Sequence, residues 1–223
     1  MHRLSLDAVT RIESVLAIGA HADDIEIGCG GTLLSLAQTS PEAELVWVVL
    51  GAEGARAEEA QRSASDFTAG FSSVRIAVEG FRDGFLPYHG GDVKEYFEGL
   101  KAEVSPDLIF THQQADLHQD HRLLSELTWN TFRDHLILEY EIPKYDGDLG
   151  APNLFVDLTE PIADRKVELL LSHFGSQRDK RWFTADLFHA LMRLRGMESN
   201  SPAGRAEAFY CRKLVIGAAP HAG

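Results

Sequence analysis

The sequence predicts a Rossmann-like three-layer α/β/α fold around a mostly parallel sheet. Two observations predict it. Short apolar runs rich in β-branched residues recur along the 223-residue chain, and amphipathic stretches of helical length separate them. Such alternation of strands and helices is typical of a parallel sheet that carries helices on both faces.

The N-terminal half contains four expected strands, each followed by a helix. SVLAIGA is apolar throughout, which predicts a buried strand. Pro106 interrupts the chain before the fourth strand, DLIFTH. The expected strands are residues 14–20, 44–51, 73–80 and 107–112, and the expected helices are 25–38, 55–70, 92–104 and about 121–133.

The C-terminal part is expected to continue with three strands and two helices. A link rich in Gly, Pro and Asp, PKYDGDLGAP, separates the first two of these strands. No internal repeat, low-complexity tract or interdomain linker is visible. We expect one domain, with a core over about 12–135 and a cap-like extension over about 136–223. The expected strands are 136–142, 153–158 and 206–216, and the expected helices are about 161–174 and 183–195.

The composition excludes some partners and settles little else. The chain has 34 acidic and 21 basic residues, for a formal net charge of -13. Nucleic acid and anionic membranes favour clustered Lys and Arg, so neither is an expected partner. The sequence shows neither a signal peptide nor a membrane span, which favours a cytoplasmic location.

The two cysteines, Cys29 and Cys211, are too few for a disulfide framework. Cys29 follows an acidic stretch closely enough to be a thiolate ligand. A small buried thiol on a helix face is the favoured interpretation.

Two polar stretches follow two of the expected strands. HADDIE closes the first strand, and THQQADLHQDHR opens at the end of the fourth. In doubly wound sheets these two strands are commonly neighbours at the point where strand order reverses, and ligands bind outside their carboxyl ends. The two stretches are therefore expected to face each other across one crevice.

The residues of that crevice are typical of a metal site. Burying several carboxylates without partners is costly, and a divalent cation removes the difficulty. Imidazole nitrogen and carboxylate oxygen are ordinary zinc ligands, and two His with one carboxylate leave a fourth position open. The principal residues are His21, Asp23, Asp24, His118, Asp120 and His121, with Glu26, His112 and Asp116 nearby.

A dinucleotide site is the rival interpretation, because IGCGG is glycine-rich and follows a strand. A pyrophosphate needs glycine amides at the strand end, where this chain has acidic residues that repel it. The glycines Gly28, Gly30 and Gly31 are instead expected to let the helix approach the sheet or a ligand closely. A dinucleotide-dependent oxidoreductase is therefore disfavoured.

Together the two stretches resemble the PIG-L/LmbE family of zinc-dependent deacetylases. Its AHPDDE-like and HxDH-like signatures stand here as AHADD (20–24) and HQDH (118–121). Ala22 replaces the proline of the family, which loosens the turn. The similarity extends to LGAEG (50–54), RDGFLP (82–87), the stretch from 156 to 177 that ends in Ser-Gln, and RAEAF (205–209).

The resemblance implies a role for each matching residue. The implied zinc ligands are His21, Asp24 and His121, although other divalent metals are possible. Asp23 would be the general base, and His118 would stabilise the oxyanion or protonate the departing amine. Asp120 would orient one of the histidines.

The resemblance also implies the reaction: hydrolysis of an N-acyl group, favoured as N-acetyl, from an amino sugar or glycoconjugate. A non-catalytic metal- or ligand-binding module of the same fold is the alternative. The expected partner is the small substrate, together with a possible homo-oligomer. Residues with a weaker expectation of substrate contact are Glu53, Arg56, Arg82 and Asp83, for which solvated loop charges or helix caps are an equally good interpretation. The resemblance also places His173 near the active site, as a further candidate for substrate contact.

Overall fold

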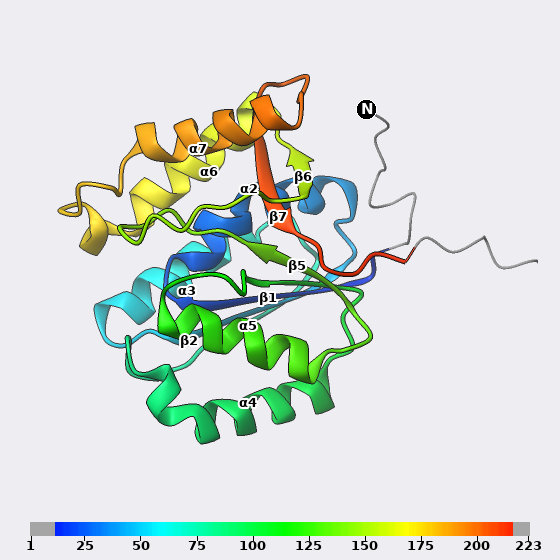
Figure 1. Cartoon of the computed structure of the whole chain (residues 1–223), viewed down its shortest axis with the longest axis vertical. Helices are drawn as coiled ribbons and strands as arrows, with labels where there is room; N and C mark the ends of the chain where they lie inside the picture. Colours follow the sequence, from blue (N-terminus) through cyan, green and yellow to red (C-terminus); the bar gives the residue numbers. More distant parts are fainter. Residues whose placement is uncertain (1–11, 216–223) are drawn as a thin grey trace, which may run out of the picture.

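The structure, a computed structural model, describes residues 12–215. Within that range the strands form one seven-stranded sheet in the order β3-β2-β1-β4-β5-β7-β6 (Figure 1). The first five strands in chain order are parallel, and β7 and β6 complete the sheet by antiparallel pairing. The strands are β1 Ser14–His21, β2 Glu44–Gly51, β3 Ser73–Val78, β4 Leu108–His112, β5 Leu136–Tyr140, β6 Leu154–Asp157 and β7 Ala206–Tyr210.

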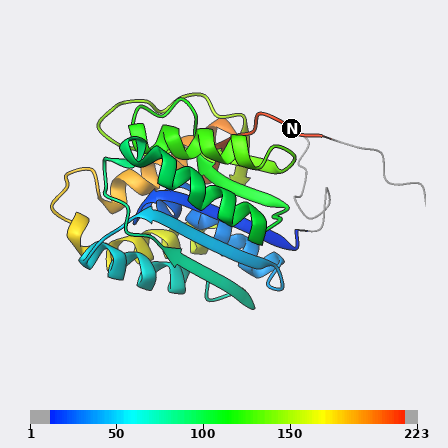
Figure 2. The ribbon, with the colours of Figure 1, turned by 90° about the horizontal axis from the view of Figure 1, so that it is seen from below.

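Helices cover both faces of the sheet, which makes three layers. On one face α2 and α6 pack together with α3 and α7, whereas α4 and α5 pair on the other. Figure 2 shows the second face, with α4 and α5 lying across the strands. The helices are α2 Asp24–Thr39, α3 Ala55–Phe67, α4 Gly90–Glu103, α5 Gln119–Thr131, α6 Glu160–His173 and α7 Ala185–Glu198, with short 3-10 turns η1 Leu86–His89 and η2 Gly175–Gln177.

The apolar residues of β1 explain why this strand is central. Alternate residues of a strand point to opposite faces of the sheet. Val15 and Ala17 belong to the core beneath α2 and α6, whereas Leu16 and Ile18 belong to the core beneath α4 and α5. Every one of these side chains is fully buried. The sequence prediction of a strand buried on both faces is confirmed.

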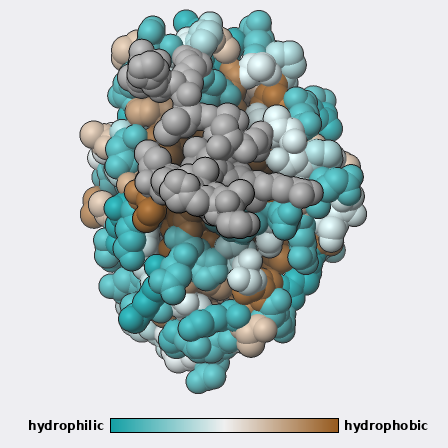
Figure 3. Space-filling view, turned by 90° about the vertical axis from the view of Figure 1, so that its right-hand side faces the viewer, coloured by the Kyte–Doolittle hydropathy of each residue, from teal (hydrophilic) through white to brown (hydrophobic). Residues whose placement is uncertain are grey.

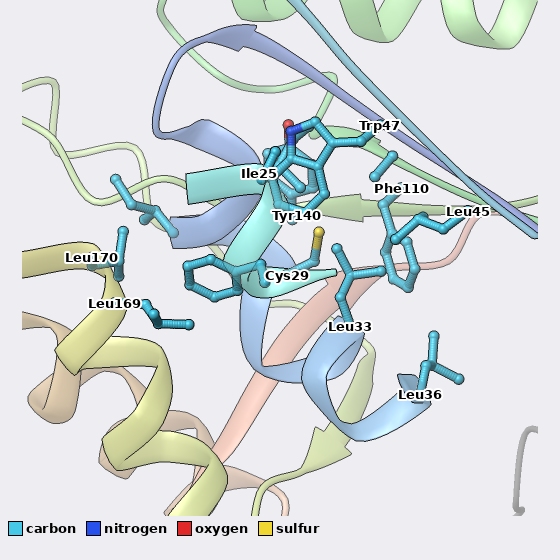
Figure 4. Close-up of a cluster of buried hydrophobic side chains, with 14 of the residues drawn as sticks. Ile25, Cys29, Leu33, Leu36, Leu45, Trp47, Phe110, Tyr140, Leu169 and Leu170 are labelled. Atoms are coloured by element: carbon cyan, nitrogen blue, oxygen red, sulfur yellow. The ribbon is translucent and has the colours of Figure 1, made fainter. Parts of the chain in front are cut away.

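Close packing of α2 on the sheet depends on its glycines. Figure 4 shows Cys29 and Leu33 of α2 among the buried side chains, with Tyr140 of β5 beside them. A Cβ atom on Gly28 would lie 2.2 Å from the Tyr140 ring, so only glycine allows this approach. The expected approach to the sheet is confirmed for Gly28, whereas a Cβ atom on Gly30 would meet Phe67 of α3. Cys29 is a fully buried free thiol, as the favoured interpretation predicted, and burial raises its pKa well above the ordinary value.

Several element boundaries differ from the predicted ones. The last strand was expected over residues 206–216, but β7 ends at Tyr210. The helix expected over 55–70 ends at Phe67, where the Thr68 hydroxyl donates to the Ala64 carbonyl in the last turn. Residues 136–210 contribute three strands to the common sheet as well as two helices to one face.

Figure 3 shows the end of the molecule at which β1 begins, opposite the end where β1 and β4 finish. Its uncovered surface is largely hydrophilic, with hydrophobic residues in small separate patches. None of the helices in the described range is long and apolar enough to cross a membrane.

Candidate metal centre and active site

The two polar stretches meet because β1 and β4 are neighbours in the sheet. β1 ends at His21, and α2 begins three residues later at Asp24. β4 ends at His112, and the following loop leads to α5, which carries Asp120 and His121 in its first turn. The two stretches therefore lie side by side at the carboxyl ends of these strands, as the sequence predicts.

Three side-chain atoms converge where the two stretches meet. His21 Nδ1 lies 3.2 Å from His121 Nε2 and 3.3 Å from Asp24 Oδ2. His121 Nε2 lies 3.5 Å from the same Asp24 oxygen. These are the three residues for which the family resemblance implied metal binding. All three are almost fully buried.

Neighbouring carboxylates determine which nitrogen of each ring carries a proton. His21 Nε2 lies 3.1 Å from Asp120 Oδ2, and His121 Nδ1 lies 3.0 Å from Asp116 Oδ2. Each of these nitrogens is therefore assigned the proton, because a carboxylate can only accept. The lone pairs of His21 Nδ1 and His121 Nε2 then point towards each other and towards the carboxylate of Asp24.

This donor set fits a divalent metal ion. Zinc binds imidazole nitrogen and carboxylate oxygen at about 2.0–2.2 Å, and tetrahedral ligands at that radius are about 3.4 Å apart. The observed separations of 3.2, 3.3 and 3.5 Å match this value. Three electron-pair donors that face one another without a proton between them repel each other, and a cation removes the repulsion.

The charges of the cluster compensate one another in the protein alone. Burial acts to lower the pKa of His21, but the Asp24 carboxylate and the hydrogen bond to Asp120 raise it well above its ordinary value. The pKa of His121 is raised in the same way, against burial, by Asp24 and Asp116. Burial acts to raise the pKa of Asp24, but the surrounding histidines hold it well below its usual range.

His112 also lies in this cluster, but its Nε2 atom accepts a backbone hydrogen bond from Ala20. Its Nε2 atom is 3.0 Å from the backbone nitrogen of Ala20, which donates to it, and 3.2 Å from Asp24 Oδ2. Burial, followed by the proximity of His121, lowers the pKa of His112 to about 4, so the ring is neutral. His112 stacks on His121 with a centroid distance of 3.8 Å and supports that ligand from behind.

His118 lies beside the donor triangle and is tied to the start of α5. Its Nδ1 atom accepts a hydrogen bond from the Asp120 backbone nitrogen at 3.3 Å, which leaves the ring proton on Nε2. The His118 ring centroid is 4.9 Å from that of His21 and 4.6 Å from that of His121. Burial and the neighbouring histidines lower the pKa of His118, so it is a neutral N–H donor at pH 7.

Asp23 caps the start of α2 and pairs with Arg56 of α3. Its Oδ1 atom accepts a hydrogen bond from Arg56 at 2.7 Å, and its side chain forms no capping bond to α2. Burial acts to lower the pKa of Arg56, but the Asp23 carboxylate raises it, so the guanidinium stays charged. Asp23 is thereby held as an oriented carboxylate beside the donor triangle.

Arg56 is itself held by a contact that the sequence did not predict. It donates to Ser176 Oγ at 3.3 Å and lies 3.6 Å from Glu59. Glu59 in turn accepts from the Ser176 backbone nitrogen at 2.9 Å and from its hydroxyl at 2.6 Å. The chain near the Ser-Gln sequence therefore anchors the arginine that contacts Asp23.

Asp120 connects His21 with the loop after β3. Its carboxylate accepts from the backbone nitrogens of Gly84 at 2.8 Å and Leu86 at 3.2 Å, besides the contact with His21. Asp83 of the same loop lies 3.2 Å from His21 Nε2 and has an exposed side chain. The loop and the ligand thus share one carboxylate.

Asp116, on the other side, links His121 with the loop after β5. Lys144 Nζ lies 3.0 Å from Asp116 and also pairs with Asp148, which accepts from the backbone nitrogen of Leu117 at 2.8 Å. Asp116 was noted in the sequence only as a nearby acid, and Lys144 was not assigned to the site. Lys144 is more than 20 residues from Asp116 in the chain, and no spacing rule connects them.

Arg82, Glu53 and His173, the remaining residues expected to contact substrate, lie in three different environments. Arg82 stacks on Phe85, with its guanidinium carbon 3.6 Å from the ring centroid. Glu53 is exposed in the loop after β2. His173 does not join the cluster: its Nε2 atom lies 2.8 Å from Asp66, near the far end of α3. Asp66 is ten residues from Arg56, or about 15 Å along the helix.

Comparison with known proteins agrees with this geometry. Residues 16–132, more than half of the chain, match the PIG-L family, GlcNAc-PI de-N-acetylase. The chain belongs to the PIG-L family. The matched range contains both motifs and every residue of the donor triangle.

Two individual proteins extend the likeness beyond the matched range. The uncharacterized deacetylase YaiS of Escherichia coli (strain K12) is 29% identical over 178 residues, which covers 75% of this chain and 94% of the relative. The N,N'-diacetylchitobiose deacetylase of Pyrococcus horikoshii has 20% identity and a TM-score of 0.67, covering 92% of this chain and 85% of its own.

The same fold also serves a different reaction. GalB, the 4-carboxy-2-hydroxymuconate hydratase of Pseudomonas putida KT2440, has a TM-score of 0.72 with 17% identity, covering 93% of this chain and 99% of its own. Likeness at this level shows the fold alone, so the reaction has to be argued from the site.

Proposed function

We propose that this PIG-L family protein is a metal-dependent deacetylase that hydrolyses the N-acetyl group of an amino sugar or glycoconjugate. The observation that carries the proposal is the buried triangle of His21 Nδ1, His121 Nε2 and Asp24 Oδ2, with sides of 3.2 to 3.5 Å. Asp23, which precedes Asp24 in the chain, and His118, whose ring lies beside His21 and His121, provide the groups that an amide hydrolase needs beside its metal.

The triangle would hold one divalent ion, and zinc is the first candidate because of its preference for nitrogen and carboxylate ligands. An ion bound there supplies Lewis-acid polarisation of the amide carbonyl and a lower pKa for the attacking water. Asp116 and Asp120 keep the two imidazole rings turned towards it.

Asp23 accepts the proton of the water that attacks the carbonyl carbon. The contact with Arg56 fixes one carboxylate oxygen and leaves the other available to the water. When the carbon–nitrogen bond breaks, the proton passes to the leaving nitrogen. The products are acetate and a free amine.

His118 stabilises the negative charge that develops on the carbonyl oxygen. Its Nδ1 atom is occupied by the Asp120 backbone N–H, so Nε2 carries the proton and can donate. A neutral, half-buried donor aimed at developing charge is more effective in a site that excludes water than in solution. We assign to His118 the oxyanion role in preference to metal binding.

The names of the family and of one similar structure, together with the charged groups near the site, support an N-acetylated amino sugar as the substrate. GlcNAc-PI and N,N'-diacetylchitobiose, named for the family and for the Pyrococcus protein, both contain N-acetylated glucosamine. Asp83, Arg82, Glu53 and Arg56 follow β2 and β3 in the chain, and their charged groups can hydrogen-bond sugar hydroxyls. We also propose that these residues contact the substrate, that the chain forms a single domain and that it assembles into a homo-oligomer.

The test measures metal content and acetate release on N-acetylglucosamine, its disaccharide and lipid-linked glycosides. The variants are Asp23→Ala and, as control, Asp92→Asn, an exposed carboxylate on α4. We expect about one metal ion per chain in all three proteins and acetate release from the wild type and the control only. Metal without release of acetate from any substrate would instead support a binding module, and absence of metal binding would refute the proposal.

A further inference from the structure

A buried ion pair joins three elements behind the metal site. Lys166 of α6 and Glu207 of β7 lie 2.6 Å apart, and both side chains are almost fully buried. The pair contacts α2, the helix whose first turn carries the ligand Asp24. Figure 1 shows α2 lying between α6 and the sheet, with β7 alongside.

Most of the bonds between the pair and α2 go to backbone groups of the helix. Lys166 Nζ donates to the Ile27 carbonyl at 2.6 Å. The Glu207 carboxylate accepts from the backbone nitrogens of Gly31 at 2.8 Å and Thr32 at 2.7 Å, and from the Thr32 hydroxyl at 2.6 Å. In an uninterrupted α-helix the Ile27 carbonyl and the Gly31 N–H bond to each other. Both of these backbone groups also bond to one member of the ion pair.

Glycine at position 31 allows this arrangement. A Cβ atom there would lie 3.0 Å from Glu207 Oε1 and 2.7 Å from Leu158 Cδ1. The glycines after the ligand motif therefore make room for Glu207 as well as for the sheet. Bonds from two other elements to the backbone of α2 tie this part of the helix to α6 and β7.

Ile27 connects the ion pair with the first turn of α2 through two backbone hydrogen bonds. Ile27, whose carbonyl Lys166 holds, donates its own N–H to the Asp23 carbonyl at 3.0 Å. The turn between these two bonds contains Asp24. The direction of this turn determines where the carboxylates of Asp23 and Asp24 lie relative to His21 and His121.

We propose that Lys166 and Glu207 are positioning residues that fix the first turn of α2 and thereby the placement of Asp24 and Asp23. The inference rests on the proposed function, because it assigns the pair a purpose at the metal centre. A buried ion pair is weak support for a role in stability, since apolar replacement is often neutral or stabilising.

A second buried ion pair offers a matched control. Arg195 of α7 binds Glu141 through Nε at 2.7 Å and through a terminal nitrogen at 2.6 Å, and also donates to the Gly150 carbonyl. All four side chains, Lys166, Glu207, Arg195 and Glu141, border one cavity. None of the hydrogen bonds that the structure shows for Arg195 or Glu141 goes to α2.

The experiment compares the double variant Lys166→Met/Glu207→Leu with Arg195→Met/Glu141→Leu. Apolar pairs of similar volume preserve folding better than single substitutions, and melting temperature and circular dichroism verify this. Metal affinity is measured by chelator competition, and the absorption spectrum is recorded after loading with Co²⁺. Lys166→Arg serves as the conservative variant.

We expect the first double variant to bind Zn²⁺ at least about tenfold more weakly than the wild type and to change the Co²⁺ spectrum. The Arg195→Met/Glu141→Leu variant, at a similar melting temperature, is expected to keep the wild-type Zn²⁺ affinity and Co²⁺ spectrum. Lys166→Arg is expected to keep part of the Zn²⁺ affinity and a spectrum closer to that of the wild type. Equal affinity and identical spectra in both double variants would overturn the inference. Failure of the wild type to bind metal would refute the proposed function instead.

Discussion

His21 Nδ1 lies 3.2 Å from His121 Nε2, and a carboxylate lies behind each ring on its opposite nitrogen. These carboxylates belong to Asp120 and Asp116. They orient the two rings so that the lone pairs of His21 Nδ1 and His121 Nε2 face each other. Without a cation, the cluster is relieved only when a histidine takes up a proton. This competition between proton and metal leads to the first prediction.

Metal binding is expected to release about one to two protons per chain near pH 7. In the metal-free protein the pKa values of His21 and His121 are raised, so both rings retain protons to higher pH than free histidine. Metal ligation requires their deprotonation. Apparent metal affinity should therefore rise with pH until those pKa values are passed. Calorimetric titrations in buffers of different ionisation enthalpy measure the released protons, and a buffer-independent enthalpy would contradict the prediction.

Replacement of Asp116 by Asn is expected to weaken metal binding about 10- to 100-fold, the usual effect of losing a carboxylate partner of a ligating histidine. The amide can still contact His121 Nδ1 but no longer carries the charge that orients the ring. Asp107→Asn is the control, because Asp107 accepts two backbone hydrogen bonds near the opposite end of β1. Chelator competition measures both, and equal losses would show that Asp116 acts only on stability.

Arg56→Met is expected to lower kcat about 100-fold while metal content stays unchanged. The guanidinium holds Asp23 at 2.7 Å, and misplacement of a catalytic group by about 1 Å has an effect of this size. Arg62→Met is the matched control, since Arg62 lies on the same helix and is mostly exposed. Arg56→Lys should recover part of the rate. An unchanged kcat with a raised KM would instead identify Arg56 as a substrate contact alone.

Two glycine substitutions test the packing of α2 on the sheet. Gly28→Ala places a methyl group 2.2 Å from the buried Tyr140 ring and is expected to destabilise the protein by about 1–3 kcal/mol. Gly99→Ala adds the same group within α4, where nothing lies within 4 Å, and should stabilise by about 0.5–1 kcal/mol. Denaturant unfolding measures both. A Gly28 variant as stable as the wild type would contradict the packing described for this helix.

Local patterns were sufficient to predict most of the fold. The apolar β1 run and the strand–helix alternation placed β1 beside β4, which brought His21 and His121 together although they are 100 residues apart. Strand ends in parallel sheets share an edge, so this contact follows from topology alone. The end of β7 at Tyr210 did not follow, because the apolar residues Leu214 and Val215 come after Arg212 and Lys213, and the sequence pattern does not show that pairing stops before them.

The supporting residues of the site could not be derived from spacing. Ser176, in the short turn η2, contacts Arg56, and Lys144, in the loop after β5, contacts Asp116. The paths of such segments are not determined by hydrophobic periodicity. His173 shows the converse: the family resemblance expected it near the site, but α6 ends there and its side chain turns to Asp66. The residue three positions later contacts Arg56 instead.

The central claim is that one metal ion is bound between His21, Asp24 and His121. Anomalous diffraction from zinc-loaded crystals, with data on both sides of the zinc absorption edge, tests it most directly. We predict a single strong peak within about 2.3 Å of His21 Nδ1, His121 Nε2 and Asp24 Oδ2. Active crystals with no peak there, or with the peak between Asp83 and Asp120 instead, would contradict this assignment.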